Sequence, residues 1–143
     1  MPFAAYCLRL LGLSQAIHAW TGSLTRLNAE RREKIARYAD AIAATLARSA
    51  AAFSTLERDG GDTRALCEAI RELGRISGYV EDIVDALQDD LDGRKLAGVK
   101  RRLDRLAESE PLRVAVTRKD ARRIDNLLEA EGYFRALADG LRT

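Results

Sequence analysis

Near the start of the chain, apolar side chains recur at alternating intervals of three and four residues. This heptad spacing lays a narrow apolar stripe along one side of a helix, and the stripe is buried only when another helix packs against it. A second stripe, interrupted by one serine, occupies the middle of the chain. The first stripe comprises Phe3, Tyr6, Leu10, Leu13, Ile17, Trp20, Leu24 and Leu27, and the second Leu66, Ile70, Leu73, Ser77, Val80, Val84, Leu87 and Leu91. Together they predict an all-α fold, a compact antiparallel bundle of four to five helices with the helix of the second stripe at its centre.

The length of the chain indicates a single helical-bundle domain over residues 1–143. A chain of this size buries about two-thirds of its unfolded surface without a metal or disulfides. Its two prolines, Pro2 and Pro111, lie outside the stripes, and good helix formers dominate the composition. Only residues 112–116 alternate in the manner of a strand, and no partner strand accompanies them.

The first two helices are predicted from their turn residues. The first helix opens at Pro2 and runs at least to Trp20. Residues 21–29 then form either a turn, which we favour, or a stutter within one long helix. The helix that follows is rich in alanine, and so many small side chains on one flank let a neighbouring helix approach closely.

The later helices have clearer signals at their ends. Residues 57–62 form the plainest loop in the chain, and Asp62 is placed to cap a helix over 63–90. A shorter helix follows and ends before Ser109. A capping box at 117–120 then opens the last helix, which runs nearly to the end of the sequence.

Residue types that carry catalysis or hold metals are scarce. His18 is the one histidine, and Cys7 and Cys67 are the two cysteines, so neither a di-metal bundle site nor a four-ligand zinc site can be assembled. Glycine-rich phosphate loops and nucleophile elbows are missing as well. We therefore expect no enzyme activity, cofactor, metal or small-molecule substrate. Both cysteines lie in apolar helical patterns, and with no secretory signal or membrane-spanning run this indicates a cytoplasmic protein.

The N-terminal helix carries unusually little charge. Arg9 is the one charged side chain in residues 1–25, whereas a surface helix normally has charges over half its circumference. Burial on most sides is the interpretation we favour. Docking on another copy or another protein, and insertion into a membrane interface, are the other two.

Charge in the middle of the chain is polarised, although the net charge is only +2. An acidic block over residues 81–92 is followed at once by a basic block over 94–105. Helical spacing places Arg94, Arg101 and Arg105 opposite the apolar residues of their helix, facing solvent. These blocks are either solvated faces or complementary patches that steer a partner.

Gly74 and Gly78 lie inside a predicted helix. Each glycine costs roughly 0.5–1 kcal/mol against alanine there, so a compensating reason is expected. Close packing against another helix of the same chain is the interpretation we favour, and a self-association contact is the other.

These observations favour a non-catalytic interaction module, an adaptor or small subunit of a larger assembly that self-associates or binds a protein partner. The candidate contact residues are Phe3, Leu10, Leu13, Trp20, Gly74, Gly78, Glu81, Asp85 and Asp89.

Two other hypotheses remain open. In the first, basic helices bind nucleic-acid phosphates through Arg94, Lys100, Arg101, Arg105, Arg118, Lys119, Arg122 and Arg123. In the second, the N-terminal helix leaves the bundle and inserts its apolar stripe into a membrane surface.

Overall fold

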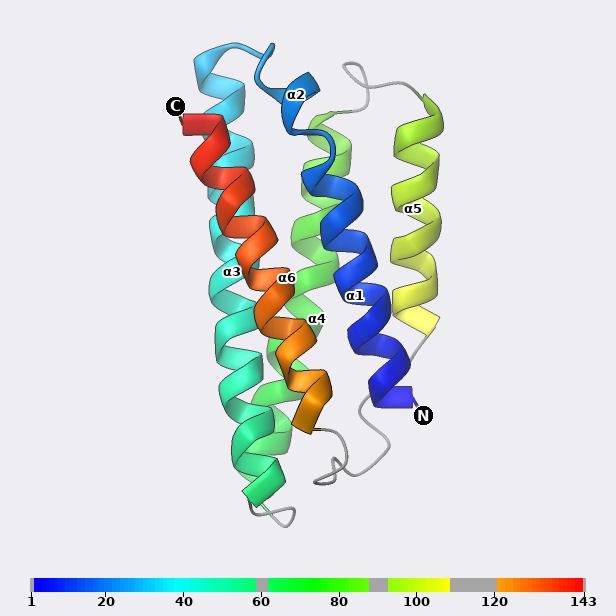
Figure 1. The fold of residues 1–143 in the computed structure, drawn as a ribbon, viewed down its shortest axis with the longest axis vertical. Helices are drawn as coiled ribbons and strands as arrows, with labels where there is room; N and C mark the ends of the chain where they lie inside the picture. The colour runs from blue at the N-terminus through cyan, green and yellow to red at the C-terminus, as the bar shows by residue number, and fades with distance from the viewer. Residues whose placement is uncertain (1, 59–61, 88–92, 109–120, 143) are drawn as a thin grey trace.

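The computed structural model describes residues 2–58, 62–87, 93–108 and 121–142, with the side chains of 2–6, 57, 63, 66, 69, 70, 73, 77, 107, 108 and 121–123 left aside. All regular structure in these ranges is helical, which confirms the all-α prediction (Figure 1). The helices are α1 Pro2–His18, α2 Thr21–Leu24, α3 Ala29–Arg58, α4 Thr63–Ala86, α5 Gly93–Glu108 and α6 Ala121–Arg142. Six helices in these ranges exceed the predicted four to five, because the short α2 follows the first helix. None of the described helices combines the length and apolarity needed to cross a bilayer.

The five long helices alternate in direction along the chain, so that α1, α4 and α6 ascend in Figure 1 while α3 and α5 descend. As the first and fifth of these helices, α1 and α6 run in the same direction. Because α6 packs between α3 and α1, these two parallel helices are neighbours. The sequence predicted an antiparallel bundle, but this pair of neighbouring helices is parallel.

The α3–α6 pair, and not α4, forms the centre of the bundle. α3 packs against α6 and α4, and α6 also contacts α1 and α2. α4 touches α3 and, less extensively, α5, and it leaves one whole face exposed. The prediction that the helix of the second stripe, α4, lies at the centre is wrong. The apolar residues of one helix do not indicate how many other helices pack against them.

Local side-chain chemistry fixes the starts of α3 and α4, whereas the first helix ends at His18, two residues before the predicted Trp20. The chain turns between α1 and α3, where the Asn28 Oδ1 accepts from the backbone N–H of Arg31 at 2.9 Å. This capping bond marks the start of α3. Residues 21–29 therefore contain a turn and are not a stutter within one long helix. At the start of α4, Asp62 Oδ1 accepts from the backbone N–H of Ala65 at 3.0 Å. The strand-like segment 112–116 and the capping box at 117–120 lie outside the described residues.

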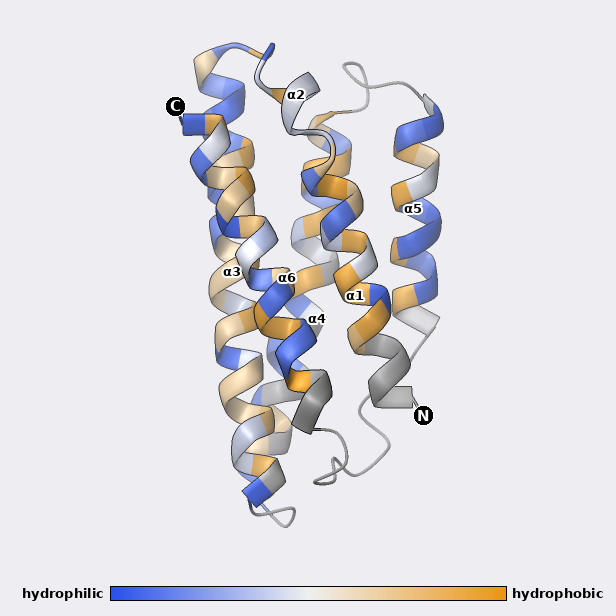
Figure 2. Ribbon diagram, in the orientation of Figure 1, coloured by the Kyte–Doolittle hydropathy of each residue, from blue (hydrophilic) through white to orange (hydrophobic). Residues whose placement is uncertain are grey.

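The core of the described residues draws on all five long helices. Leu10, Leu13 and Ile17 of the first stripe are fully buried, and apolar positions recur along each helix (Figure 2). Ala39 and Ala43 of α3 are also fully buried, so its neighbours approach its backbone as the small side chains predicted. This arrangement leaves the charged sides of α4 and α5 facing outward.

The last turn of α6 is tied to α3 by Arg142. Its guanidinium donates to both carboxylate oxygens of Glu33, at 3.1 and 3.2 Å, and to Asp40 Oδ2 at 2.6 Å. The hydrogen bond from Arg142 lowers the pKa of Glu33 from its ordinary value of 4.5, and the guanidinium pKa rises in turn. A cation at a helix C-terminus also opposes the negative end of the helix dipole.

We expect Arg142→Met to remove an acid-sensitive part of the stability. A carboxylate whose folded pKa is depressed stabilises the fold above its unfolded pKa, and this contribution is lost as the pH falls through the folded value. The variant should melt below the parent at pH 7, and the difference should shrink as the pH falls below 4.5. Thermal melts at several pH values measure it. Arg37→Met is the control, because Arg37 lies farther from Glu33, at 3.7 Å, and should have a smaller effect. A pH-independent difference for Arg142→Met would contradict the assignment.

Candidate functional site

The apolar residues of α1 proposed as a contact surface are in the core. Leu10 and Leu13 are fully buried and Trp20 is 4% exposed, so they form no surface in this fold. α1 packs between α6 and α5. Its other side is exposed and includes Leu8, at 49%, so burial on most sides, the interpretation that the sequence favoured, accounts for only part of the sparse charge of α1. The side chain of Phe3 lies outside the described part of the structure.

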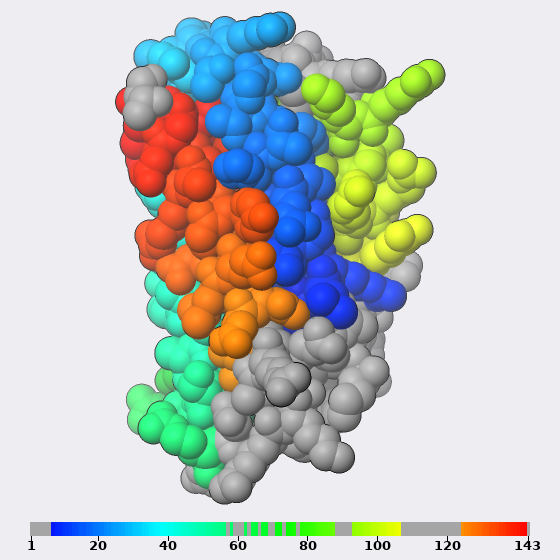
Figure 3. Space-filling view, viewed as in Figure 1, coloured from blue at the N-terminus to red at the C-terminus, as the bar shows by residue number. Residues whose placement is uncertain are grey.

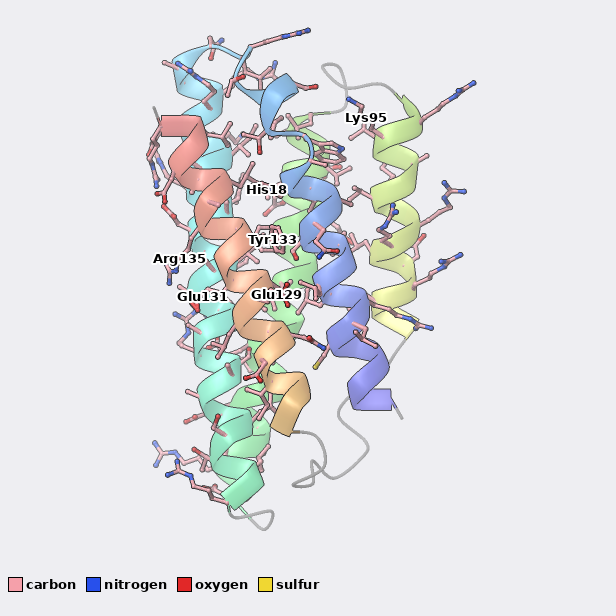
Figure 4. All side chains as sticks on the ribbon, viewed as in Figure 1. His18, Lys95, Glu129, Glu131, Tyr133 and Arg135 are labelled. Atoms are coloured by element: carbon pink, nitrogen blue, oxygen red, sulfur yellow. The ribbon has the colours of Figure 1, made fainter. Side chains whose placement is uncertain are left out.

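The exposed side of α1 joins α6 in the front face of Figure 3, where α1 is blue and α6 orange to red. The two helices meet in a polar contact: Gln15 Nε2 donates to the Tyr133 hydroxyl at 3.4 Å. The rings of His18 and Tyr133 pack edge to face at 5.4 Å between centroids (Figure 4). His18 is therefore a helix-flank residue, as its sequence position indicated.

The exposed side of α4 carries a stripe that points away from the bundle. At about 100° per residue, the stripe lies opposite the buried Ile76, Val80 and Ile83. Its members are all exposed: Cys67, Arg71, Gly74, Gly78, Glu81 and Asp85. We call this set the α4 stripe. Asp89, the remaining candidate from this region, lies outside the described residues.

The two glycines of the α4 stripe face open space. A Cβ added to Gly74 or to Gly78 would meet no atom within 4 Å. The interpretation that they permit close packing within the chain therefore does not hold in the described part of the structure, where no neighbouring helix passes over them.

Some charged side chains around the α4 stripe are ion-paired or hydrogen-bonded to other described residues, and others are not. Glu72 is buried and bonded on both sides, by Arg48 of α3 at 3.1 Å and by Arg75 at 3.7 Å. Arg75 also donates to the Tyr79 hydroxyl at 2.9 Å. In contrast, Arg71 and Glu81 make no ion pair with other described residues. They are exposed and available to a partner.

α5 presents its basic residues outward, as predicted. Arg94, Arg101 and Arg105 are exposed, whereas the apolar residues on the opposite side of the helix, such as Val99 and Leu106, are buried. Lys100 is also exposed. The other predicted phosphate contacts are not placed: Arg118 and Lys119, and the side chains of Arg122 and Arg123, lie outside the described part of the structure.

A groove between α1 and α5 collects arginines that sequence reasoning did not group together. Its lining is Arg9 and Gly12 of α1 with Arg102 and Arg105 of α5, and its volume is about 290 Å³. Arg9 reaches across it and donates to the backbone carbonyl of Arg105 at 3.0 Å. We call it the arginine groove. The signal in the sequence was the isolation of Arg9, the one charge in residues 1–25.

The groove on the other flank of α5, toward α4, is acidic. Glu81 and Asp85 of α4 and Asp104 of α5 line it with a single cation, Lys100, around a volume of about 280 Å³. In the described residues the two signs of charge are therefore separated around α5, with Glu81, Asp85 and Asp104 on the α4 side and Arg102 and Arg105 on the α1 side. Among the described residues, no group of three or more His, Cys, Asp or Glu side chains is arranged to hold a metal ion.

Comparison with known proteins adds no functional guide, since no family model, curated protein or solved structure matches this chain. The proposals below therefore rest on the exposed surfaces of the bundle.

Proposed function

We propose that this protein is a non-catalytic interaction module, a helical-bundle subunit that pairs with a second copy of itself through the α4 stripe. The observation that carries the proposal is the open surface over Gly74 and Gly78. Two glycines inside a helix cost roughly 0.5–1 kcal/mol each against alanine, and no described neighbour within the chain packs over them. A second helix crossing at this point would use them, because missing side chains let two backbones approach.

The charges of the α4 stripe favour a second copy as the partner. Consider two α4 helices packed antiparallel about a two-fold axis midway between Gly74 and Gly78. Gly74 then faces Gly78 of the second copy, and Arg71 faces Glu81, twice by symmetry. An isologous interface must be self-complementary, and this stripe satisfies that requirement in both glycine position and charge.

The other two hypotheses for this chain rank lower as its main function. Membrane insertion of α1 would first remove Leu10, Leu13 and Ile17 from the core, and it would leave the faces of α6 and α5 that they cover in contact with water. This cost weighs against the membrane proposal. Nucleic-acid binding involves a different surface. Because Cys67 is a free and exposed thiol, we place the protein in a reducing compartment, the cytoplasm.

Sedimentation equilibrium from micromolar to submillimolar protein tests the pairing. We expect a monomer–dimer equilibrium that Gly78→Leu shifts strongly to monomer, because the added side chain blocks the crossing. The same change should raise monomer stability, since leucine is the better helix former and an added Cβ meets no atom. Gly132→Leu is the matched control on α6, where the glycine is also exposed with open space above it. This control should leave association unchanged.

A charge exchange tests the orientation of the pair. Arg71→Glu alone places acids opposite acids and should weaken association, and adding Glu81→Arg should restore it. A parent protein that stays monomeric throughout the concentration range overturns the proposal. So does a Gly78→Leu variant that associates like the parent.

A further inference from the structure

We propose that α5, together with Arg9 of α1, binds the phosphodiester backbone of nucleic acid, and that the arginine groove holds one phosphate. The surface is separate from the α4 stripe, so the inference is independent of self-association.

The arginine groove brings guanidinium groups of two helices together. Arg9, Arg102 and Arg105 line a volume of about 290 Å³, although elsewhere in residues 1–25 the chain carries no charge at all. Guanidinium groups that converge on one volume offer an anion several N–H donors at once. The lining also leaves room for one: Gly12 has no side chain, and a Cβ built on it would meet no atom within 4 Å.

The chemistry of the lining favours phosphate over a protein surface. Guanidinium groups present paired N–H donors that match the oxygens of a phosphate. Protein–protein contacts instead need an apolar centre, often aromatic, to supply binding energy. Among the described residues, the lining of this groove is arginine and glycine. These residues offer an acidic protein charge but no apolar anchor.

The groove continues into a row of cations along α5. Arg94, Arg101 and Arg105 share the outward side of the helix. The eleven-residue interval between Arg94 and Arg105 corresponds to about 16 Å along the helix axis. Phosphates of one DNA strand recur about every 3.4 Å along the duplex axis, so the row spans about five of them. A linear polyanion fits this row better than a single small anion does.

Glu81 and Asp85, the acids of the block that lie beside α5 in the described residues, do not oppose this contact, because they face its other flank. Asp104 lines the groove toward α4 together with Glu81 and Asp85, whereas Arg102 lines the groove toward α1. α5 itself carries no aromatic side chain that would stack on bases. The contact is therefore to the backbone, and we infer binding that is independent of base sequence.

Fluorescence anisotropy with labelled duplex and single-stranded oligonucleotides of two unrelated sequences tests the inference. Five phosphate contacts, from Arg9, Arg94, Arg101, Arg102 and Arg105, predict a log–log salt slope of about −4.5 for duplex. Affinity should then fall roughly 500-fold between about 50 and 200 mM salt, equally for both sequences. No binding of either nucleic acid at low salt and micromolar protein overturns the proposal.

Paired variants locate the site. Arg9→Gln with Arg102→Gln should reduce the slope by about two units, and Arg101→Gln alone, at an exposed position, by about one. Arg64→Gln with Arg135→Gln is the matched control, because it removes the same net charge. Both arginines are exposed and pair with glutamates on their own helices. This control should leave the slope unchanged. If both double variants changed the slope equally, binding would depend on the net charge of the protein alone, and the assignment of the site would be overturned.

Competition distinguishes the ligand class. Unlabelled duplex should displace the probe, while polyglutamate of similar charge and vesicles of anionic lipid should not at matched charge concentration. Displacement by polyglutamate or by vesicles as effective as by duplex would overturn the assignment to nucleic acid. Arg101→Gln should melt like the parent in circular dichroism. Its effect on the salt slope therefore tests the surface even if the Arg9 variant does not fold.

Discussion

Replacing Phe134 with alanine is expected to lower the free energy of unfolding by about 3–5 kcal/mol. Phe134 is 1% exposed and belongs to α6, which packs against α3, α1 and α2 at once. Truncation therefore removes buried apolar surface and leaves a cavity that three neighbours cannot all fill. Urea denaturation measures the loss, and the melting temperature should fall by roughly 10–15 °C.

The matched control is Leu128→Ala in the same helix. Leu128 is large and apolar but 47% exposed. Its truncation should change stability by no more than about 0.5 kcal/mol. Equal losses for Phe134→Ala and Leu128→Ala would mean that α6 is not oriented in the bundle as described.

The sequence predicted which side of each helix is buried, because that property is local. Heptad spacing identified Leu10, Leu13 and Ile17 as core residues, and Asp62 marked the start of α4. It did not predict that α1 and α6 are parallel neighbours or that α4 lies at one side. A stripe specifies a buried face but not the helix that covers it, and that choice depends on contacts distant in sequence.

The same division applies to where the candidate residues lie, because exposure is a local property and contact between helices is not. The exposure of Arg94, Arg101 and Arg105 followed from their angle to the apolar side of one helix, so sequence sufficed. Arg9 joins Arg102 only because α1 packs beside α5, which no spacing within either helix reveals. Gly74 and Gly78 were assigned to packing within the chain for the same reason: sequence shows a small-residue face but not whether a helix passes over it.

Where a helix does pass over small residues, enlarging one should be damaging, and Ala43→Leu in α3 is expected to destabilise the fold by about 1–3 kcal/mol. Ala43 is fully buried on a helix that packs against both α6 and α4, so a leucine there forces the backbones apart. Ala51→Leu is the control, since Ala51 lies on the same helix with its side chain exposed and should change stability little. Urea denaturation of both variants gives the comparison. A neutral Ala43→Leu would show that α3 has room for larger side chains, and the alanines would then owe their presence to helix propensity alone.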